Sequence, residues 1–113
     1  MPTTAADLRR VALELFASDG YTSTSLQQIA DRAGVSKASV LYHFASKEVL
    51  LESVLAPAVD QLDSILGEAR LAQLRDGGAE RAVFLEHFVD FLLEHRAAAV
   101  IFVNQATWLV DVP

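Results

Sequence analysis

The sequence predicts an all-α fold, with a small three-helix head followed by a helical bundle. Three observations support this prediction. Apolar residues recur at intervals of three and four through most of the 113 residues. Glycines stand where short helices should end. No segment shows the two-residue alternation of a half-buried strand. With 52% hydrophobic residues, 5 Gly and 3 Pro, the composition argues against a disordered chain.

The first two helices of the head are marked by apolar stripes and by their ends. Gly20 provides a left-handed stop for the first helix. Thr24 followed by Gln27 has the pattern of a capping box, and a second helix is expected from about Ser25 to Ala33. The apolar stripe of the first helix consists of Leu8, Val11, Ala12, Leu15 and Phe16, and that of the second consists of Leu26, Ile29, Ala30 and Ala33.

A tight junction joins the second helix to a third. Gly34 closes the second helix, and Ser36 is placed to cap the next one. Two short helices joined by a glycine turn form a helix-turn-helix, an arrangement that many proteins use to bind DNA. We therefore assign residues 1–46 to a helix-turn-helix DNA-binding domain.

The remaining residues, 47–113, are predicted to form a second, helical domain that appears incomplete. Ser46 begins a connecting helix, in which Pro57 predicts a kink or break near Ala56 because proline lacks an amide proton. Arg75–Gly78 (RDGG) is the clearest loop. Two apolar helices follow it, at residues 81–95 and at about 97–110.

The third helix has an outward face that suits a groove better than water. With Val40 directed inward, a step of about 100° per residue places Ala38 and Tyr42 roughly opposite. The same wheel places Ser36 and Phe44 on the core side, Ser39 and Leu41 on the flanks, and Lys37 and His43 at the borders. Small residues let a helix approach base edges, and Tyr, Lys and His can reach phosphates. The alternative is that Tyr42 packs against a loop and that His43 is simply exposed.

Lys47 gives a separate indication of a nucleic-acid surface. A cation in the first turn of a helix opposes the helix dipole, whereas the neighbouring Glu48 suits that position. A phosphate docked at this helix end would be held by the lysine together with free backbone N–H groups. The alternative is an ordinary solvated lysine.

The charge and the composition exclude several other classes of protein. The net charge of -6 argues against nucleic acid at first, but residues 1–53 hold five basic and six acidic side chains, whereas residues 54–113 hold four and nine. The chain has no Cys, which excludes disulfides, thiolate metal sites and cysteine nucleophiles. Neither a signal sequence nor a membrane span is expected, because the longest apolar run, AAAVIFV, is too short. We expect a cytoplasmic protein.

Leu8–Leu55 closely resembles the N-terminal DNA-binding domain of TetR-family transcriptional regulators. The matching pieces are LELF, Gly20-Tyr21, Thr24-Ser25, Ile29-Ala30, AGVS, His43-Phe44 and Ser46-Lys47-Glu48. The resemblance implies that the third helix enters the major groove. It implies that Thr24, Tyr42, His43 and Lys47 hold phosphates, and that Lys37, Ala38 and Ser39 face bases. Leu41 stands where the family commonly has its tyrosine, and could make an apolar contact at the groove edge. Ser36, the cap, completes the candidate interface.

By the same resemblance, the second domain would bind a small-molecule effector of unknown identity and form a homodimer. The chain stops before the last helices of the family, so it is either shortened or departs from that architecture. Core packing is favoured over an effector pocket for the aromatic residues Phe84, Phe88, Phe91, Phe102 and Trp108. A solvated strip is favoured over a metal site for His87, Asp90 and Glu94.

The leading hypothesis is a sequence-specific regulator, a ligand-responsive repressor that binds a palindromic DNA operator as a dimer. The alternative is a helical interaction module that no longer binds DNA and pairs with an intact relative. An enzyme is not expected, since Ser36 and His43 lie two helical turns apart and no acid orients the histidine. No cofactor or metal is predicted.

Overall fold

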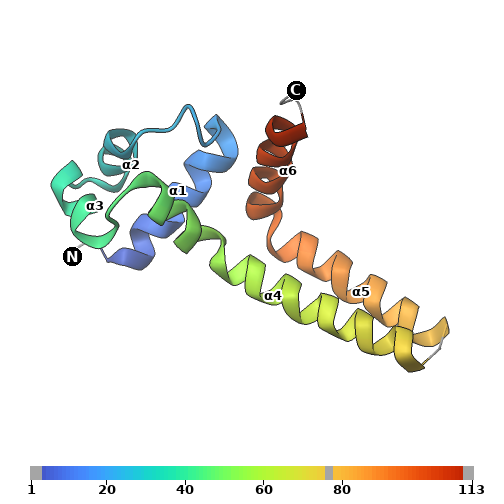
Figure 1. The fold of residues 1–113 in the computed structure, drawn as a ribbon. Helices are drawn as coiled ribbons and strands as arrows, with labels where there is room; N and C mark the ends of the chain where they lie inside the picture. Colours follow the sequence, from blue (N-terminus) through green and yellow to red (C-terminus); the bar gives the residue numbers. More distant parts are fainter. Residues whose placement is uncertain (1–3, 76–77, 111–113) are drawn as a thin grey trace. The chain divides into compact units, whose positions relative to one another are not determined.

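The computed structural model describes residues 4–75 and 78–110 and is helical along nearly all of them (Figure 1). No strand occurs among these residues. The helices are α1 (Ala5–Asp19), α2 (Leu26–Ala33), α3 (Lys37–His43), α4 (Lys47–Arg75), α5 (Gly78–Glu94) and α6 (Arg96–Val110). The all-α prediction is confirmed. Among the described residues, no helix combines the length and apolarity needed to cross a bilayer.

The contacts divide the chain into two compact units. The first joins the residues up to Leu55 with α6 from Ala97 onward, and the second comprises Ala56–Arg96. This grouping differs from the predicted boundary at residues 46 and 47, because Ile101 of α6 is 1% exposed and belongs to the core of the head. The rest of that core comes from α1 to α4: Leu8, Val11, Ala12, Leu15, Phe16, Ile29, Ala30, Val40, Phe44, Leu50 and Val54.

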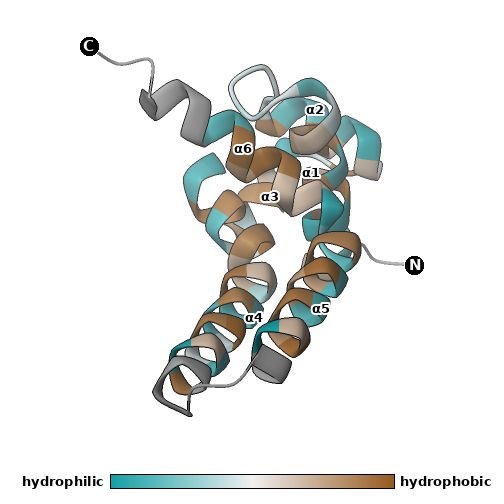
Figure 2. Ribbon diagram, turned by 90° about the vertical axis from the view of Figure 1, so that its right-hand side faces the viewer, coloured by the Kyte–Doolittle hydropathy of each residue, from teal (hydrophilic) through white to brown (hydrophobic). Residues whose placement is uncertain are grey.

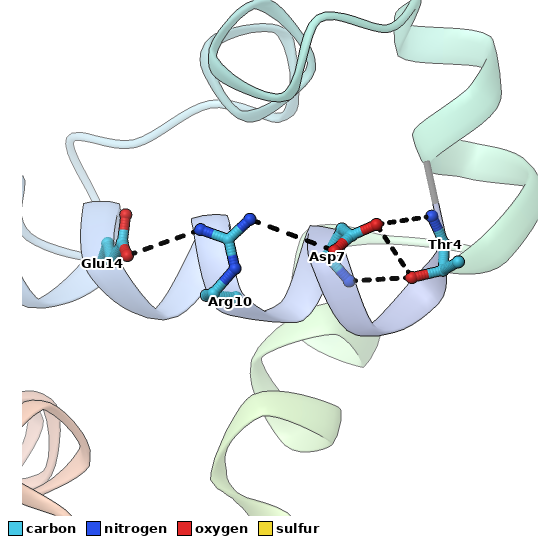
Figure 3. A network of polar contacts seen from close by, with 4 residues as sticks. All are labelled: Thr4, Asp7, Arg10 and Glu14. Atoms are coloured by element: carbon cyan, nitrogen blue, oxygen red, sulfur yellow. Dashed lines mark hydrogen bonds and ion pairs between the residues drawn. The ribbon is translucent and has the colours of Figure 1, made fainter. Parts of the chain in front are cut away.

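The helix ends of the first unit follow local chemistry. Thr4 caps α1 in a capping box with Asp7, which lowers the pKa of the Asp7 carboxyl because the Thr4 backbone N–H and hydroxyl donate to it (Figure 3). Gly20 ends α1 with φ +94°, and Gly34 ends α2 with φ +75°, both in a region that favours glycine. Ser36 caps α3 as predicted, since its Oγ accepts from the Ser39 N–H at 3.1 Å.

The capping box of α2 is one residue later than predicted. Ser25, rather than Thr24, is the N-cap: its Oγ accepts from the Gln28 N–H at 3.1 Å, and Gln28 Oε1 accepts from the Ser25 N–H at 2.7 Å. The Thr24 hydroxyl donates instead to the Gly20 carbonyl at 2.8 Å. Because that hydroxyl is drawn toward the end of α1, only the next residue is free to cap α2.

We expect Ser25→Ala to destabilise the first unit by about 1 kcal/mol, the usual cost of losing an N-cap hydroxyl. Ser23→Ala, in the same loop, removes an exposed hydroxyl and is the matched control, with an expected change below about 0.5 kcal/mol. Urea unfolding followed by circular dichroism measures both. Equal effects of the two substitutions would show that the assigned cap is wrong.

Pro57 does not interrupt α4, which is continuous from Lys47 to Arg75, so the break that was one form of the prediction does not occur, whereas the kink stays a prediction. A proline removes its own hydrogen bond to the preceding turn, yet the helix continues through Pro57, and Val54 before it and Ala58 after it are both buried. The division between the two units falls between Leu55 and Ala56, close to the proline. The loop predicted at Arg75–Gly78 coincides with the junction of α4 and α5, although residues 76 and 77 lie outside the described residues.

The second unit is an antiparallel pair formed by the later part of α4 and by α5 (Figure 1). Polar contacts cross between the two helices: His95 Nε2 lies 2.7 Å from Gln61 Oε1, and His87 Nδ1 lies 2.9 Å from Glu68 Oε2. Residue numbers rise along one helix as they fall along the other. Ala58, Ile65 and Phe91 are buried in this unit. Among the residues of this unit whose side chains are described, much of the apolar surface faces outward, since Leu66, Val83 and Leu85 are among the exposed ones.

Candidate nucleic-acid interface

The outward face of α3 is the candidate interface. Ala38, Leu41 and Tyr42 are all exposed, and their spacing of three and four residues puts them on one stripe. Tyr42 is 85% exposed, although a tyrosine normally buries most of its ring. Val40 is fully buried on the opposite side and Phe44 is 5% exposed. The predicted orientation of this helix is confirmed.

The residues around this stripe are polar and accessible. Lys37 and His43 are exposed, and the His43 ring lies edge-to-face with Tyr42 at a centroid distance of 5.1 Å. Ser39 is half-buried. Ser36 was placed on the core side by the helical wheel but is exposed, because a capping residue lies outside the helix and does not follow its periodicity. The face thus presents a small centre with hydroxyl, aromatic and cationic groups around it.

Thr24 does not belong to this accessible face. Its side chain is 2% exposed, and its hydroxyl donates to the carbonyls of Gly20 at 2.8 Å and Leu15 at 3.3 Å. The expectation that this hydroxyl holds a phosphate therefore disagrees with the structure. A buried hydroxyl needs internal acceptors, and Thr24 finds them at the end of α1.

Lys47 lies in the first turn of α4 but its ammonium points to the loop between α1 and α2. Lys47 Nζ donates to the carbonyls of Tyr21 at 2.8 Å and Thr24 at 3.0 Å. It also lies 4.2 Å from the centroid of the Tyr21 ring, a cation–π contact. The unfavourable position of a cation at this helix end is thus offset by neutral protein acceptors. Contact of Lys47 with a phosphate stays a prediction.

Tyr21 entered the sequence analysis only as part of the family resemblance, without an assigned contact, yet it lies at the centre of this one. Its ring meets Phe16 edge-to-face at 5.2 Å and accepts the Lys47 ammonium on one face. Burial raises the pKa of the Tyr21 hydroxyl, and the Glu48 carboxylate raises it further. The ring is therefore neutral at physiological pH. An aromatic residue directly after the helix-ending Gly20 was the available signal, since such a residue is placed to pack back on the helix.

A second group of basic residues lies between α1 and α2 but is offset by carboxylates. Arg10 is within 4.0 Å of Asp7 and 3.8 Å of Glu14, as Figure 3 shows. Arg32 lines the same shallow hollow as these three residues. Mixed charge of this kind attracts phosphate less strongly than an uncompensated cation. This compensation makes the hollow a weaker candidate for phosphate binding than the α3 face, on which Lys37 is exposed.

The aromatic residues of α5 contact one another along the helix. Phe84, Phe88, Phe91 and His95 form a row of ring contacts along α5, with centroids 5.2 to 6.3 Å apart. Phe91 is buried and Phe102 of α6 is half-buried, whereas the side chain of Trp108 lies outside the described residues. Nowhere in the described part of the chain do three or more His, Cys, Asp or Glu side chains gather closely enough to hold a metal ion.

Three helices with a glycine turn before an exposed third helix define the class of protein as a helix-turn-helix protein of the all-α type. Residues 8–54 match the family described as bacterial regulatory proteins, tetR family. The chain belongs to the TetR family of transcriptional regulators.

The proteins with similar sequences include both a transcriptional repressor and a transcriptional activator. The HTH-type transcriptional repressor KstR2 of Mycolicibacterium smegmatis is 34% identical over 113 residues, covering 95% of this chain and 52% of that protein. The HTH-type transcriptional activator FasR of the same organism is 40% identical over 84 residues, covering 74% of this chain and 37% of that protein. The HTH-type transcriptional regulator RutR of Escherichia coli K12 is 49% identical over 49 residues, covering 43% and 23%.

Among solved structures, the ketosteroid transcriptional regulator KstR2 of Mycobacterium tuberculosis superposes with a TM-score of 0.73 at 28% identity. The match covers 100% of this chain and 57% of that one. The chain thus spans about half the length of the KstR2 proteins that it matches.

Proposed function

We propose that this chain is a sequence-specific DNA-binding regulator whose α3 enters the major groove. The observation that carries the proposal is the exposed stripe of Ala38, Leu41 and Tyr42, with Val40 buried behind it. A small residue at the start of a helix lets the backbone approach base edges closely. An apolar and aromatic stripe of this kind is costly to leave in water. Membership of a family of regulatory proteins favours DNA as the molecule that covers it.

Each exposed residue of α3 is given a role by its chemistry. Lys37, Ala38 and Ser39 face bases: the lysine donates to acceptors such as guanine O6 and N7, and the alanine methyl meets thymine methyls. Tyr42 and His43 donate to phosphates on the groove wall, as does the free hydroxyl hydrogen of Ser36. Leu41 makes an apolar contact at the groove edge. Lys47 could add a phosphate contact only by using an N–H that the loop carbonyls leave free.

Repression by a homodimer, controlled by a small molecule, is the finer form of the proposal. Two α3 helices must reach successive major grooves on one side of the duplex, roughly 34 Å apart, and a rigid-body change that alters this spacing releases DNA. The similarity to the repressor KstR2, which extends over 95% of this chain, favours repression. The activator FasR is also similar in sequence, over 74% of this chain. Leu85, Val89 and Leu93 are exposed on α5, a helix that is brown over much of its length in Figure 2, and this apolar surface favours self-association.

Selection of bound sequences from a random duplex pool, followed by a salt series, tests the proposal. A specific regulator enriches one sequence pattern, and its affinity falls steeply with salt because each phosphate contact releases counterions. A pattern with two inverted half-sites supports the dimer. No measurable DNA affinity even at low salt would instead favour the second candidate, a helical interaction module. The acidic second half and the exposed apolar side chains of α5 fit that candidate.

We expect Lys37→Ala to lower affinity for the selected duplex by about 1–3 kcal/mol and to weaken the preference for particular bases, since Lys37 is exposed at the start of α3. Repeating the selection with the variant measures both effects. Arg81→Ala removes the same charge from an exposed position of α5 and serves as the control. If both variants bind equally well and keep the same base preference, Lys37 makes no base contact.

A further inference from the structure

Lys47 connects two segments that are distant in sequence. The carbonyls that it binds belong to residues 23 and 26 positions earlier, in the loop between α1 and α2. We propose that Lys47 is a positioning residue: it fixes this loop, residues 20–24, on the first turn of α4, and supports DNA binding through the loop rather than through a phosphate. The effect on DNA rests on the proposed function. The effect on the loop does not.

The loop is shaped so that its carbonyls need a cation. The Thr24 N–H donates to the Tyr21 carbonyl at 3.2 Å, which closes a turn. The carbonyls of Tyr21 and Thr24 then converge on one point, where their negative ends repel each other unless a donor separates them. The Lys47 ammonium occupies that point, and the Tyr21 ring accepts the same charge on its face. Charge-assisted bonds of this kind are stronger than neutral ones.

The position of the loop affects the position of α3, the helix proposed to enter the major groove. Ser25, the N-cap of α2, follows the loop directly, and α2 leads to α3 through the single turn at Gly34 and Val35. A displaced loop therefore displaces both helices of the helix-turn-helix. An ammonium group has three N–H bonds, two of which are used by carbonyls. At most one is left for any other acceptor, which disfavours a phosphate role.

Lys37 and Lys47 are the two lysines of the chain, so they form a matched pair for substitution by methionine. In the absence of DNA, Lys47→Met should speed hydrogen exchange of the Thr24 amide by about tenfold, because the turn that protects it opens more often. Lys37→Met should leave that exchange unchanged. With a duplex selected by the unmodified chain, Lys47→Met should lower affinity while keeping the slope of log affinity against log salt.

A phosphate contact would give the opposite result. If Lys47→Met leaves Thr24 exchange unchanged and lowers the salt slope by about 0.9, the value for one phosphate contact, the proposal is overturned. If the Lys47→Met variant fails to fold, a measurement on the unmodified chain still tests whether Lys47 binds the loop. Its side-chain ammonium spectrum should show one slowly exchanging lysine signal shifted by a ring, and Tyr21→Leu should remove that shift. Two rapidly exchanging signals would overturn the proposal. If the unmodified chain binds no duplex, the proposed function fails while the exchange measurement still tests the loop contact.

Discussion

Phe16→Ala is expected to destabilise the first unit by about 3–5 kcal/mol, the usual cost of removing a buried aromatic side chain. Phe16 is 1% exposed and contacts the ring of Tyr21, so the cavity would open beneath the loop that precedes α2. Small domains have a total stability of about 5–15 kcal/mol, so this loss is a large fraction of the free energy of unfolding. Urea unfolding measured by circular dichroism gives the change.

Tyr42→Ala is the matched control for this prediction, because it removes a similar ring from a position that is 85% exposed. Its expected effect on stability is below about 0.5 kcal/mol. Comparable losses from the two substitutions would contradict the assignment of Phe16 to the core and of Tyr42 to the surface.

Ala38→Glu is expected to reduce DNA affinity roughly 100-fold or more, because a like charge placed against phosphates costs several kcal/mol. Its effect on folding should be neutral or slightly favourable. Ala38 is exposed in the first turn of α3, where a carboxylate suits the helix dipole and where the helix has no acidic residue of its own. Binding is measured with the selected duplex and folding by thermal unfolding.

Ala82→Glu adds the same charge at an exposed position of α5 and controls for net charge. We expect it to leave affinity nearly unchanged. Loss of affinity in both variants would indicate a general charge effect. Retention of affinity in Ala38→Glu would show that the outward face of α3 is not the DNA surface.

The helices of the head were predictable because their signals are local. Apolar spacing and glycine stops depend on neighbours within a few residues, and α1, α2 and α3 lie within a few residues of where these signals place them. The outward direction of Ala38 and Tyr42 was predictable for the same reason, since one buried residue, Val40, determines the face of a short helix.

The cap of α2 shows where local signals become ambiguous. Thr24 with Gln27 and Ser25 with Gln28 both have the spacing of a capping box, and nothing nearby in the sequence separates them. Burial decides between them: the Thr24 hydroxyl is enclosed against the Leu15 and Gly20 carbonyls, which leaves Ser25 as the cap.

By itself, the sequence determined the all-α class, the helix-turn-helix and the exposed face of α3, because each depends on the periodicity of a helix and on residues a few positions apart. Tertiary structure alone decided that Lys47 binds the loop carbonyls, that Thr24 is buried and that Ile101 of α6 joins the core of the head. These contacts join segments that lie far apart along the chain or depend on how the helices pack. Their partners are chosen by packing, which no local pattern encodes.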